Sequence, residues 1–359
     1  MNNMFEKRDK KKRNISELGE FGLIDHLTAN RKYVQPSTIQ GVGDDTAVID
    51  SGDHYTLLTK DLLLEGVHFD MTYYPLKHLG YKAITVNLSD IYAMNGTPRQ
   101  VIVGMGISSR FPLEAIEELY SGMYLACEKY GVDLVGGDTT SSLRGLFLSV
   151  TAIGTVEKDK VTYRGPALEG DLVCVSGDLG GAYAGLLVLE REKSVYKANP
   201  NMQPDLEGHD YILERQLKPE ARKDIVKLLG DLKIKPSAMI DISDGLASEI
   251  KHICKHSDLG CTIYEDKIPI DQKTYDTARS FKMDPTTYAM NGGEDYELLF
   301  TIPGEHYEKF KNLPDISVIG HMTHKSNGIN LITKNNAVAE IKAQGWDHMK
   351  EPDSGEKQN

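Results

Sequence analysis

Five short motifs, distributed over both halves of the chain, combine carboxylates with glycine or hydroxylated residues. They are GVGDDTA at residues 41–47, NLSD at 87–90, GGD at 136–138, DISD at 241–244 and GGED at 292–295. A further carboxylate, Asp61, lies in the largely apolar run 57–66. Glycine lets the backbone bend tightly and approach a ligand closely. If these motifs meet in the folded chain, they form an oxygen-lined pocket that needs cations, so the fold must bring distant segments together.

Convergence of the carboxylates would have a defined energetic consequence. Two carboxylates about 5 Å apart repel each other by roughly 3 kcal/mol at an effective dielectric constant of about 20. Several such pairs would cancel most of the ~5–15 kcal/mol by which a domain is stable. A cluster must therefore be protonated, dispersed or bound to metal ions. For any single Asp, a surface or helix-capping position is the simpler interpretation. The candidates for a cluster are Asp45, Asp61, Asp90, Asp138, Asp241 and Asp244.

The ligand types at these positions indicate which cation would bind. Oxygen ligands without His or Cys companions favour Mg²⁺ over Zn²⁺, and Mg²⁺ commonly binds together with the phosphates of a substrate. Glycine-rich turns beside the carboxylates could donate backbone N–H groups to phosphate oxygens. The sequence contains neither a P-loop nor the HRD and DFG motifs of protein kinases. The motifs therefore predict a Mg²⁺- and phosphate-binding site outside those two fold classes.

The composition limits the number of domains and the classes of partner. A chain of 359 residues, 40% of them hydrophobic, is too long for one ordinary core, so two domains are expected. The formal net charge of -12 argues against nucleic acid or an anionic membrane as the partner. No apolar run of about 18 residues predicts a membrane span, and the charged N-terminus does not resemble a secretory signal. The four cysteines form no Cys-x-x-Cys pair, which favours free thiols and a cytoplasmic location.

Hydrophobic periodicity predicts alternating helices and strands in the first half. Helices are expected over residues 17–29, 76–94 and 112–130, and strands over 56–64, 100–107, 132–135 and 146–156. On the helix 76–94, Asn87 and Asp90 are three residues apart and share a face. Asp90 would then lie among apolar neighbours, where a carboxylate needs a partner.

The second half begins after a stretch at residues 158–171 that is expected to be the domain boundary. Strands are expected over 172–176, 296–302, 317–322 and 329–333, and helices over 181–192, 219–229 and 246–256. Ser243 is a candidate N-cap of the last of these helices. The polar segment 194–209, rich in Asn and Pro, is expected to be a surface insertion.

The motifs together resemble those of the thiamine-monophosphate kinase family, in the superfamily typified by aminoimidazole ribonucleotide synthetase. The resemblance extends from LGEFGLI at residues 18–24 to GW at 345–346. Its most specific parts are GDDTA at 43–47, EGVHF at 65–69, VGGDT at 135–139, DISDGL at 241–246 and GGEDYELLF at 292–300. The resemblance implies transfer of the γ-phosphoryl group of ATP to thiamine monophosphate, giving thiamine diphosphate, with several Mg²⁺ ions.

The resemblance also implies the architecture. The fold class would be α/β and α+β, a two-domain PurM-like fold. Residues 14–158 would form the N-terminal ATP- and Mg²⁺-binding domain, whose mixed sheet pairs with that of a second copy in a homodimer. Residues 159–348 would form the C-terminal α+β domain. Residues 1–13 are expected to be a disordered basic tail, and residues 349–359 a second tail.

The site residues implied by the resemblance fall into three groups. The metal ligands would be Asp45, Thr59, Lys60, Asp61, Asp90, Asp138, Asp241 and Asp244. The ATP contacts would be Tyr120, Gly137, Asp138, Arg164 and Ser243, and the substrate contacts His68, Glu294 and Trp346. Asp61 and Asp138 would be catalytic because they would hold a metal ion at the transferring group. The attacking phosphate oxygen is already ionised at neutral pH, so no general base is required.

One departure and two alternatives accompany the resemblance. The family commonly has a second Thr where Lys60 stands, and only the backbone carbonyl of a Lys could bind Mg²⁺. One alternative is another ATP-using synthetase of the superfamily. Selenophosphate synthetase would need a reactive Cys near the N-terminus, whereas the first cysteine here is Cys127. The other alternative is a non-catalytic module that binds a Mg²⁺-nucleotide without turnover.

Overall fold

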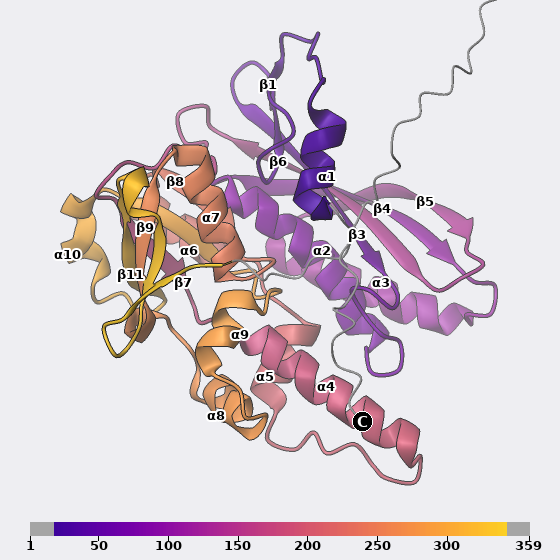
Figure 1. The fold of residues 1–359 in the computed structure, drawn as a ribbon. Coiled ribbons are helices and arrows are strands. Elements are labelled where there is room, and N and C mark those ends of the chain that lie inside the picture. Colours follow the sequence, from indigo (N-terminus) through magenta and orange to yellow (C-terminus); the bar gives the residue numbers. More distant parts are fainter. Residues whose placement is uncertain (1–17, 343–359) are drawn as a thin grey trace, which may run out of the picture. The chain divides into compact units, whose positions relative to one another are not determined.

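The computed structural model describes residues 18–342 (Figure 1). The chain divides into two units, one of residues 1–34 with 347–359 and one of residues 35–346. The described part of the first unit contains helix α1 (Gly19–Thr28), which confirms the helix expected there. The second unit contains two β-sheets and the remaining helices. Among the described residues, no helix has the length and apolar character needed to cross a bilayer.

The first sheet has six strands in the order β1-β2-β3-β6-β4-β5. The strands are β1 (Thr38–Gln40), β2 (Ala47–Asp50), β3 (Tyr55–Leu64), β4 (Thr97–Ile107), β5 (Asp133–Ser141) and β6 (Phe147–Val156). Only β4 and β5 pair in parallel; all other neighbours are antiparallel. Side chains alternate along β3, so Leu57, Thr59 and Leu63 are buried whereas Leu58 and Leu62 are exposed. The sheet therefore has one face in the core and one face in solvent.

Two helices, α2 (Leu76–Ala93) and α3 (Leu113–Tyr130), belong to the buried side of this sheet and pack closely against each other. A Cβ atom at Gly80 would lie 1.9 Å from the carbonyl oxygen of Leu119, and one at Gly122 would lie 1.8 Å from that of Lys77. The two glycines are thus required for the backbone approach. Helix α2 contacts β3, β4 and β6 of the first sheet, and also β8 of the second. It therefore carries its side chains to the place where the two sheets meet.

The second sheet has seven strands in the order β13-β12-β9-β11-β7-β10-β8. The strands are β7 (Leu172–Ser176), β8 (Ala238–Asp241), β9 (Gly260–Tyr264), β10 (Leu298–Ile302), β11 (Ile316–Thr323), β12 (Ile329–Ile332) and β13 (Val338–Glu340). The helices of this part are α4 (Gly181–Ala198), α5 (Asp210–Leu217), α6 (Lys223–Asp231), α7 (Leu246–Ser257), α8 (Gln272–Ser280), α9 (Pro285–Asn291) and α10 (Tyr307–Phe310). Strand β8 is an edge strand that contacts α2, and Asp241 is its last residue.

The expected fold class, a mixed N-terminal sheet with helices followed by an α+β part, is confirmed. The first sheet occupies residues 38–156 and the second residues 172–340; the division at residues 158 and 159 stays a prediction. The two expected tails, residues 1–13 and 349–359, lie outside the described residues.

Several local expectations were wrong. Strand β5 does not end before GGD but continues through it to Ser141, because pairing with β4 outweighs the low strand propensity of glycine. Helix α4 continues to Ala198, so the segment 194–209 is partly helical. Ser243 is not the N-cap of α7: the helix starts after Gly245, whose φ of 105° makes the turn, and no side chain caps it. Helix α5 was not expected at all.

Candidate metal and phosphate site

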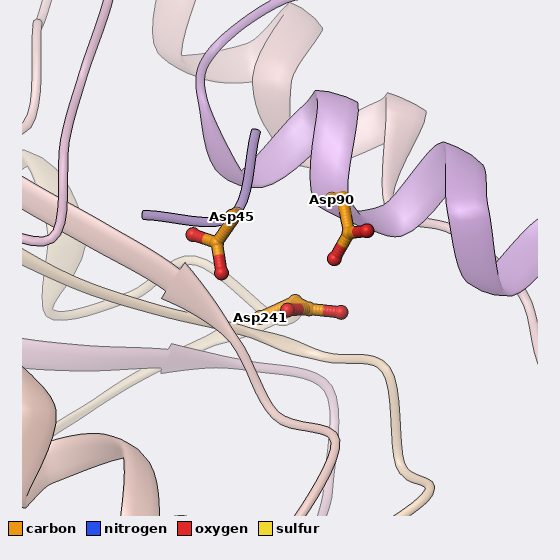
Figure 2. A group of neighbouring side chains, drawn as sticks. All are labelled: Asp45, Asp90 and Asp241. Atoms are coloured by element: carbon orange, nitrogen blue, oxygen red, sulfur yellow. The ribbon is translucent and has the colours of Figure 1, made fainter. Parts of the chain in front are cut away.

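Three carboxylates from three distant segments converge where the two sheets meet (Figure 2). Asp45 lies in the turn between β1 and β2, Asp90 in the last turns of α2, and Asp241 at the end of β8. Each offers a carboxylate oxygen, and these oxygens all lie within 4.8 Å of one another. Asp45 and Asp241 are buried, and Asp90 is partly buried. The distant acidic motifs therefore meet, as the sequence predicts for this trio.

Hydroxyl groups orient two of these carboxylates. The Thr59 hydroxyl on β3 donates a 2.5 Å hydrogen bond to Asp90 Oδ2. The Ser89 hydroxyl on α2 donates a 2.6 Å hydrogen bond to Asp241 Oδ2 and so connects α2 to β8. In Asp90 and Asp241 these hydrogen bonds use Oδ2, so Oδ1 can bind another partner.

Asp45 has a cationic partner on only one of its oxygens. Arg164 donates to Asp45 Oδ1 from Nη2 at 2.6 Å and from Nε at 3.1 Å. The backbone N–H of Arg164 donates to the neighbouring Asp44, 3.2 Å from Oδ2. Among the described residues, Asp45 Oδ2 is buried and accepts no hydrogen bond. A buried carboxylate oxygen without a donor is costly, and a bound cation would satisfy it.

The electrostatics of the cluster are those of buried like charges. Burial, followed by the charge of Asp45, raises the pKa of Asp241 to about 8. Burial, followed by the charges of Asp61 and Asp241, raises the pKa of Asp90 well above its ordinary value. Burial and Asp45 raise the pKa of Asp61 to about 6 and that of Asp44 to about 7. The raised pKa values favour the protonated forms of these carboxyls, so divalent ions would compete with protons for the same oxygens.

Two further predicted ligands lie beside this trio. The backbone N–H of Asp61, on β3, donates to Asn87 Oδ1 at 3.0 Å. Asp244 follows Asp241 in the loop before α7, and its backbone N–H donates to Glu249 Oε1 at 2.8 Å. Glu249 is buried in the first turn of α7, and burial together with Asp244 raises its pKa. Glu249 thus extends the acidic site, although no motif in the sequence indicates it.

Other predicted residues have no described side-chain contact with the trio. Asp138 and Gly137 are exposed on β5, the edge strand of the first sheet, where Asp138 is paired with Gly104. Lys60 is exposed, on the face of β3 opposite to Thr59. Tyr120, on α3, has its ring 6.1 Å from that of Tyr124.

The predicted substrate contacts are separated as well. His68 Nδ1 accepts a 3.1 Å hydrogen bond from the backbone N–H of Leu64. Glu294 is engaged on both oxygens, by Lys82 Nζ at 2.8 Å and by Gln216 Nε2 at 2.7 Å. Trp346 lies outside the described residues. Lys82 was missed because a lysine within a helix pattern resembles a surface residue, whereas here it is 1% exposed.

Comparison with known proteins agrees with this geometry. The model for the N-terminal domain of AIR synthase related proteins matches residues 43–156, and the model for the C-terminal domain matches residues 169–330. The thiamine-monophosphate kinase of Aquifex aeolicus is 34% identical over 93% of this chain and 99% of its own length. That of Bacillus subtilis is 33% identical over 93% of this chain and 100% of its own length.

Solved structures give the same result. A structure described as AaThiL complexed with AMPPCP and TMP superposes with a TM-score of 0.80 and 32% identity, covering 94% of this chain and all of its own. Hydrogenase maturation protein HypE of E. coli has a TM-score of 0.65 at 18% identity, covering 91% of this chain and 98% of its own, and shares the fold alone. The PurM-like fold and the resemblance expected from the motifs are confirmed, and the chain belongs to the thiamine-monophosphate kinase family.

Proposed function

We propose that this protein transfers the γ-phosphoryl group of ATP to thiamine monophosphate, giving thiamine diphosphate, at the site built by Asp45, Asp90 and Asp241. Membership of the kinase family supports the reaction, and the relative solved with AMPPCP and TMP supports the pair of substrates. The observation that carries the proposal is the convergence of three carboxylate oxygens within 4.8 Å. A cluster of this kind suits the transfer of a highly charged group between two phosphorylated molecules.

The residues of the trio fit Mg²⁺, which is the cation we propose. They offer oxygen ligands only, and Asp45 Oδ2 is buried without a hydrogen-bond donor among the described residues. Asp45, Asp90 and Asp241 would hold the ions, with Asp61 and Asp244 beside them, and Thr59 would orient Asp90. Bound Mg²⁺ supplies charge neutralisation for the phosphates as negative charge redistributes during transfer.

The chain itself has little covalent chemistry to perform. The attacking phosphate oxygen is ionised at neutral pH, so the protein needs to position it in line with the γ-phosphoryl group and does not need to remove a proton from it. Arg164 offers a planar fork of donors suited to phosphate, and Asp45 Oδ1 now occupies part of it. A nucleotide phosphate would compete with Asp45 for this guanidinium, while a cation would replace Arg164 at Asp45.

The remaining predicted contacts are part of the same proposal. Asp138 would be a catalytic metal ligand, and Gly137 and Tyr120 would contact the nucleotide. These roles require that a ligand or a second subunit reach the β5 edge. Ser243 would contact ATP, Lys60 would bind metal through its carbonyl, and His68, Glu294 and Trp346 would contact thiamine monophosphate.

We also propose that the protein is a homodimer in the cytoplasm. The solvent-facing side of the first sheet carries the exposed apolar residues Leu58, Leu62, Leu64, Ile102 and Val135. An exposed apolar sheet face of this kind favours pairing with an identical face.

A product assay tests the proposal. The protein is incubated with ATP, MgCl₂ and thiamine monophosphate, and thiamine diphosphate is separated and measured against a reaction without thiamine monophosphate. We expect stoichiometric formation of thiamine diphosphate and ADP. ATP hydrolysis without thiamine diphosphate, or nucleotide binding without turnover, would contradict the proposed function.

A further inference from the structure

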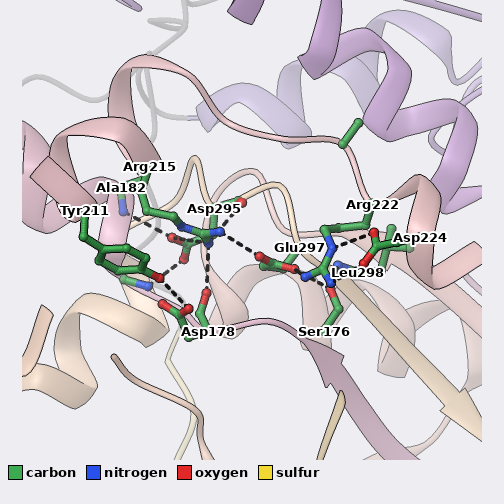
Figure 3. A network of polar contacts seen from close by, with 12 residues as sticks. Ser176, Asp178, Ala182, Tyr211, Arg215, Arg222, Asp224, Asp295, Glu297 and Leu298 are labelled. Atoms are coloured by element: carbon green, nitrogen blue, oxygen red, sulfur yellow. Dashed lines mark hydrogen bonds and ion pairs between the residues drawn. The ribbon is translucent and has the colours of Figure 1, made fainter. Parts of the chain in front are cut away.

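The carboxylates of the acidic motif GGEDYEL, at residues 292–298, accept hydrogen bonds from other groups of the protein. Figure 3 shows the donors around two of the motif's three carboxylates, those of Asp295 and Glu297. Asp295 accepts from the backbone N–H groups of Gly180, at 2.7 Å, and Ala182, at 3.4 Å. Glu297 accepts from Ser176 at 2.5 Å and forms ion pairs with Arg215 and Arg222. Asp295 and Glu297 are therefore bonded within the protein and do not form a second open cluster of ligands.

Two consecutive residues of α5 reach all three acids. Arg215 Nη1 lies 2.8 Å from Glu297 Oε1, and Arg215 Nη2 lies 3.6 Å from Asp295 Oδ1. Gln216 Nε2 donates to Glu294 Oε2 at 2.7 Å. The side chains of Asp295 and Glu297 are 0% and 1% exposed, so both need compensating charge. The guanidinium of Arg215 supplies it to both acids, and that of Arg222 supplies it to Glu297.

The backbone at this motif adopts a conformation that needs such support. Glu294 has φ of 58° and Tyr296 has φ of 51°, in the left-handed region that residues with a Cβ atom disfavour. Gly293, with φ of 71°, packs so closely that a Cβ there would lie 2.6 Å from the carbonyl oxygen of Ser243. The surrounding contacts therefore determine the shape of the turn at residues 293–297.

The turn is bonded directly to the segment that carries Asp241 and Ser243. The Glu294 N–H donates to Ser243 O at 2.6 Å, and the Tyr296 N–H donates to Ile242 O at 2.9 Å. In return the Ile242 N–H donates to Glu297 O at 2.8 Å. Burial, followed by the charges of Glu294, Asp61 and Asp241, raises the pKa of Tyr296. The turn is thus continuous with the candidate metal site.

We propose that Arg215 and Gln216 are positioning residues, which hold the turn 293–297 against residues 241–243 and so place Glu294 for the phosphoryl acceptor. The acceptor's identity rests on the proposed function, whereas the anchoring of the turn does not. Neither residue reaches Asp45, Asp90 or Asp241 through any described contact, so their effect on the reaction passes through the turn.

The tests use Arg215→Met, Arg215→Met/Glu297→Gln and Gln216→Met. The double variant also neutralises Glu297, which would lose one of its two guanidinium partners in Arg215→Met. Gln216→Met keeps every ion pair of the network and serves as the milder test variant. Arg191→Met is the matched control, because Arg191 pairs with Glu192 and lies over Phe281, away from the turn. We expect the KM for thiamine monophosphate to rise at least about tenfold in the test variants, and by a larger factor than the Kd for AMPPCP. The control should match the wild type.

Amide hydrogen exchange reports on the turn without any turnover. We expect faster exchange at the N–H groups of Ile242, Glu294 and Tyr296 in the test variants and not in Arg191→Met. Unchanged exchange at these three amides would overturn the proposal even if the wild type did not act on thiamine monophosphate. Faster exchange with an unchanged KM for thiamine monophosphate, or an equal loss of AMPPCP affinity, would also overturn it, because the effect would then be general rather than directed at the acceptor.

Discussion

Two groups of buried carboxylates, which look alike in the sequence, are built in opposite ways. The trio Asp45, Asp90 and Asp241 has one guanidinium, that of Arg164, bound to one oxygen of Asp45. The network of Asp295 and Glu297 has two guanidinium groups and backbone or hydroxyl donors on both acids. Among residues 18–342, the first group has too few cationic partners for its charge, whereas the second obtains its cationic partners from α5 and from Arg222 before α6.

This difference in charge compensation bears on how an acidic motif in a sequence should be interpreted. A carboxylate near glycine is a candidate ligand only when the fold leaves it without internal cations. In the trio the neighbours that shift the pKa of Asp241 include two other carboxylates, Asp45 and Asp61. At Asp295 the charge of Arg215 and two backbone N–H groups counteract the effect of burial, which raises the pKa to about 7. The trio therefore suits exchangeable cations, and the network suits permanent structure.

The largest expected effect comes from neutralising one member of the trio. Asp241→Asn keeps the shape of the side chain and its hydrogen bond with Ser89, but it weakens the hold on a cation. We expect turnover to fall by about a thousandfold or more, as it does when a charge-stabilising group is lost from a site of phosphoryl transfer. We expect the free energy of unfolding in EDTA near neutral pH to change by less than about 1 kcal/mol, because the raised pKa of Asp241 favours its uncharged form there, which Asn resembles.

Steady-state rates at saturating ATP and thiamine monophosphate, together with urea unfolding, measure both quantities. Asp61→Asn should lose turnover in the same direction. Asp50→Asn is a suitable control, because Asp50 is at the end of β2 and pairs with Lys158 away from the trio. A near-normal rate for Asp241→Asn would remove the distinction between the two groups.

Neutralising one acid of the network should act on stability instead. Glu297→Gln leaves Arg215 and Arg222 buried with less compensating charge, so we expect the free energy of unfolding to fall by about 3 kcal/mol. Urea unfolding measures this loss. Glu214→Gln, at an exposed residue of the same helix as Arg215, should change the free energy by no more than about 0.5 kcal/mol. Equal effects of the two substitutions would show that the network contributes nothing particular.

The smallest of the three effects is the dependence of stability on pH without metal ions. The carboxyl of Asp241 loses its proton near its ordinary pKa of 3.8 in the unfolded chain but near pH 8 in the folded one. The contribution of this carboxyl to the free energy of unfolding is fully present below about pH 4 and is lost as the pH rises to about 8. We expect the free energy of unfolding in EDTA to fall by about 2 kcal/mol between pH 6 and pH 8. Urea unfolding at the two values measures it, and Asp241→Asn should reduce the slope. A rise in stability over this range would contradict the raised pKa.

The sequence predicts the elements with strong periodicity and the carboxylates with strong local motifs. Helix α2 and strand β3 were expected within one residue of their observed limits, because buried side chains recur at the spacing of a helix or a strand. Asp45, Asp90 and Asp241 were among the six candidates for a cluster because their motifs, taken together, favour a common site, although each motif alone does not. In these cases the local pattern and the tertiary environment agree.

The remainder depends on contacts that a linear pattern does not contain. Helix α5 has only eight residues, too few for an apolar pattern to repeat along it, although Arg215 and Gln216 on it bind the acidic turn. Lys82 and Glu249 resemble surface charges until the fold buries them. Strand β5 contains two glycines, and only its ladder with β4 makes the segment a strand. The motif of Asp138 could not reveal that this strand lies at the sheet edge.

Anomalous diffraction from crystals grown with Mn²⁺, AMPPCP and thiamine monophosphate tests the central claim most directly, because Mn²⁺ prefers the same oxygen ligands as Mg²⁺ and its position can be observed. We predict anomalous peaks about 2.1 Å from carboxylate oxygens of Asp45, Asp90 and Asp241. Peaks confined to other acids, with Arg164 still the partner of Asp45 and none at the trio, would contradict the account.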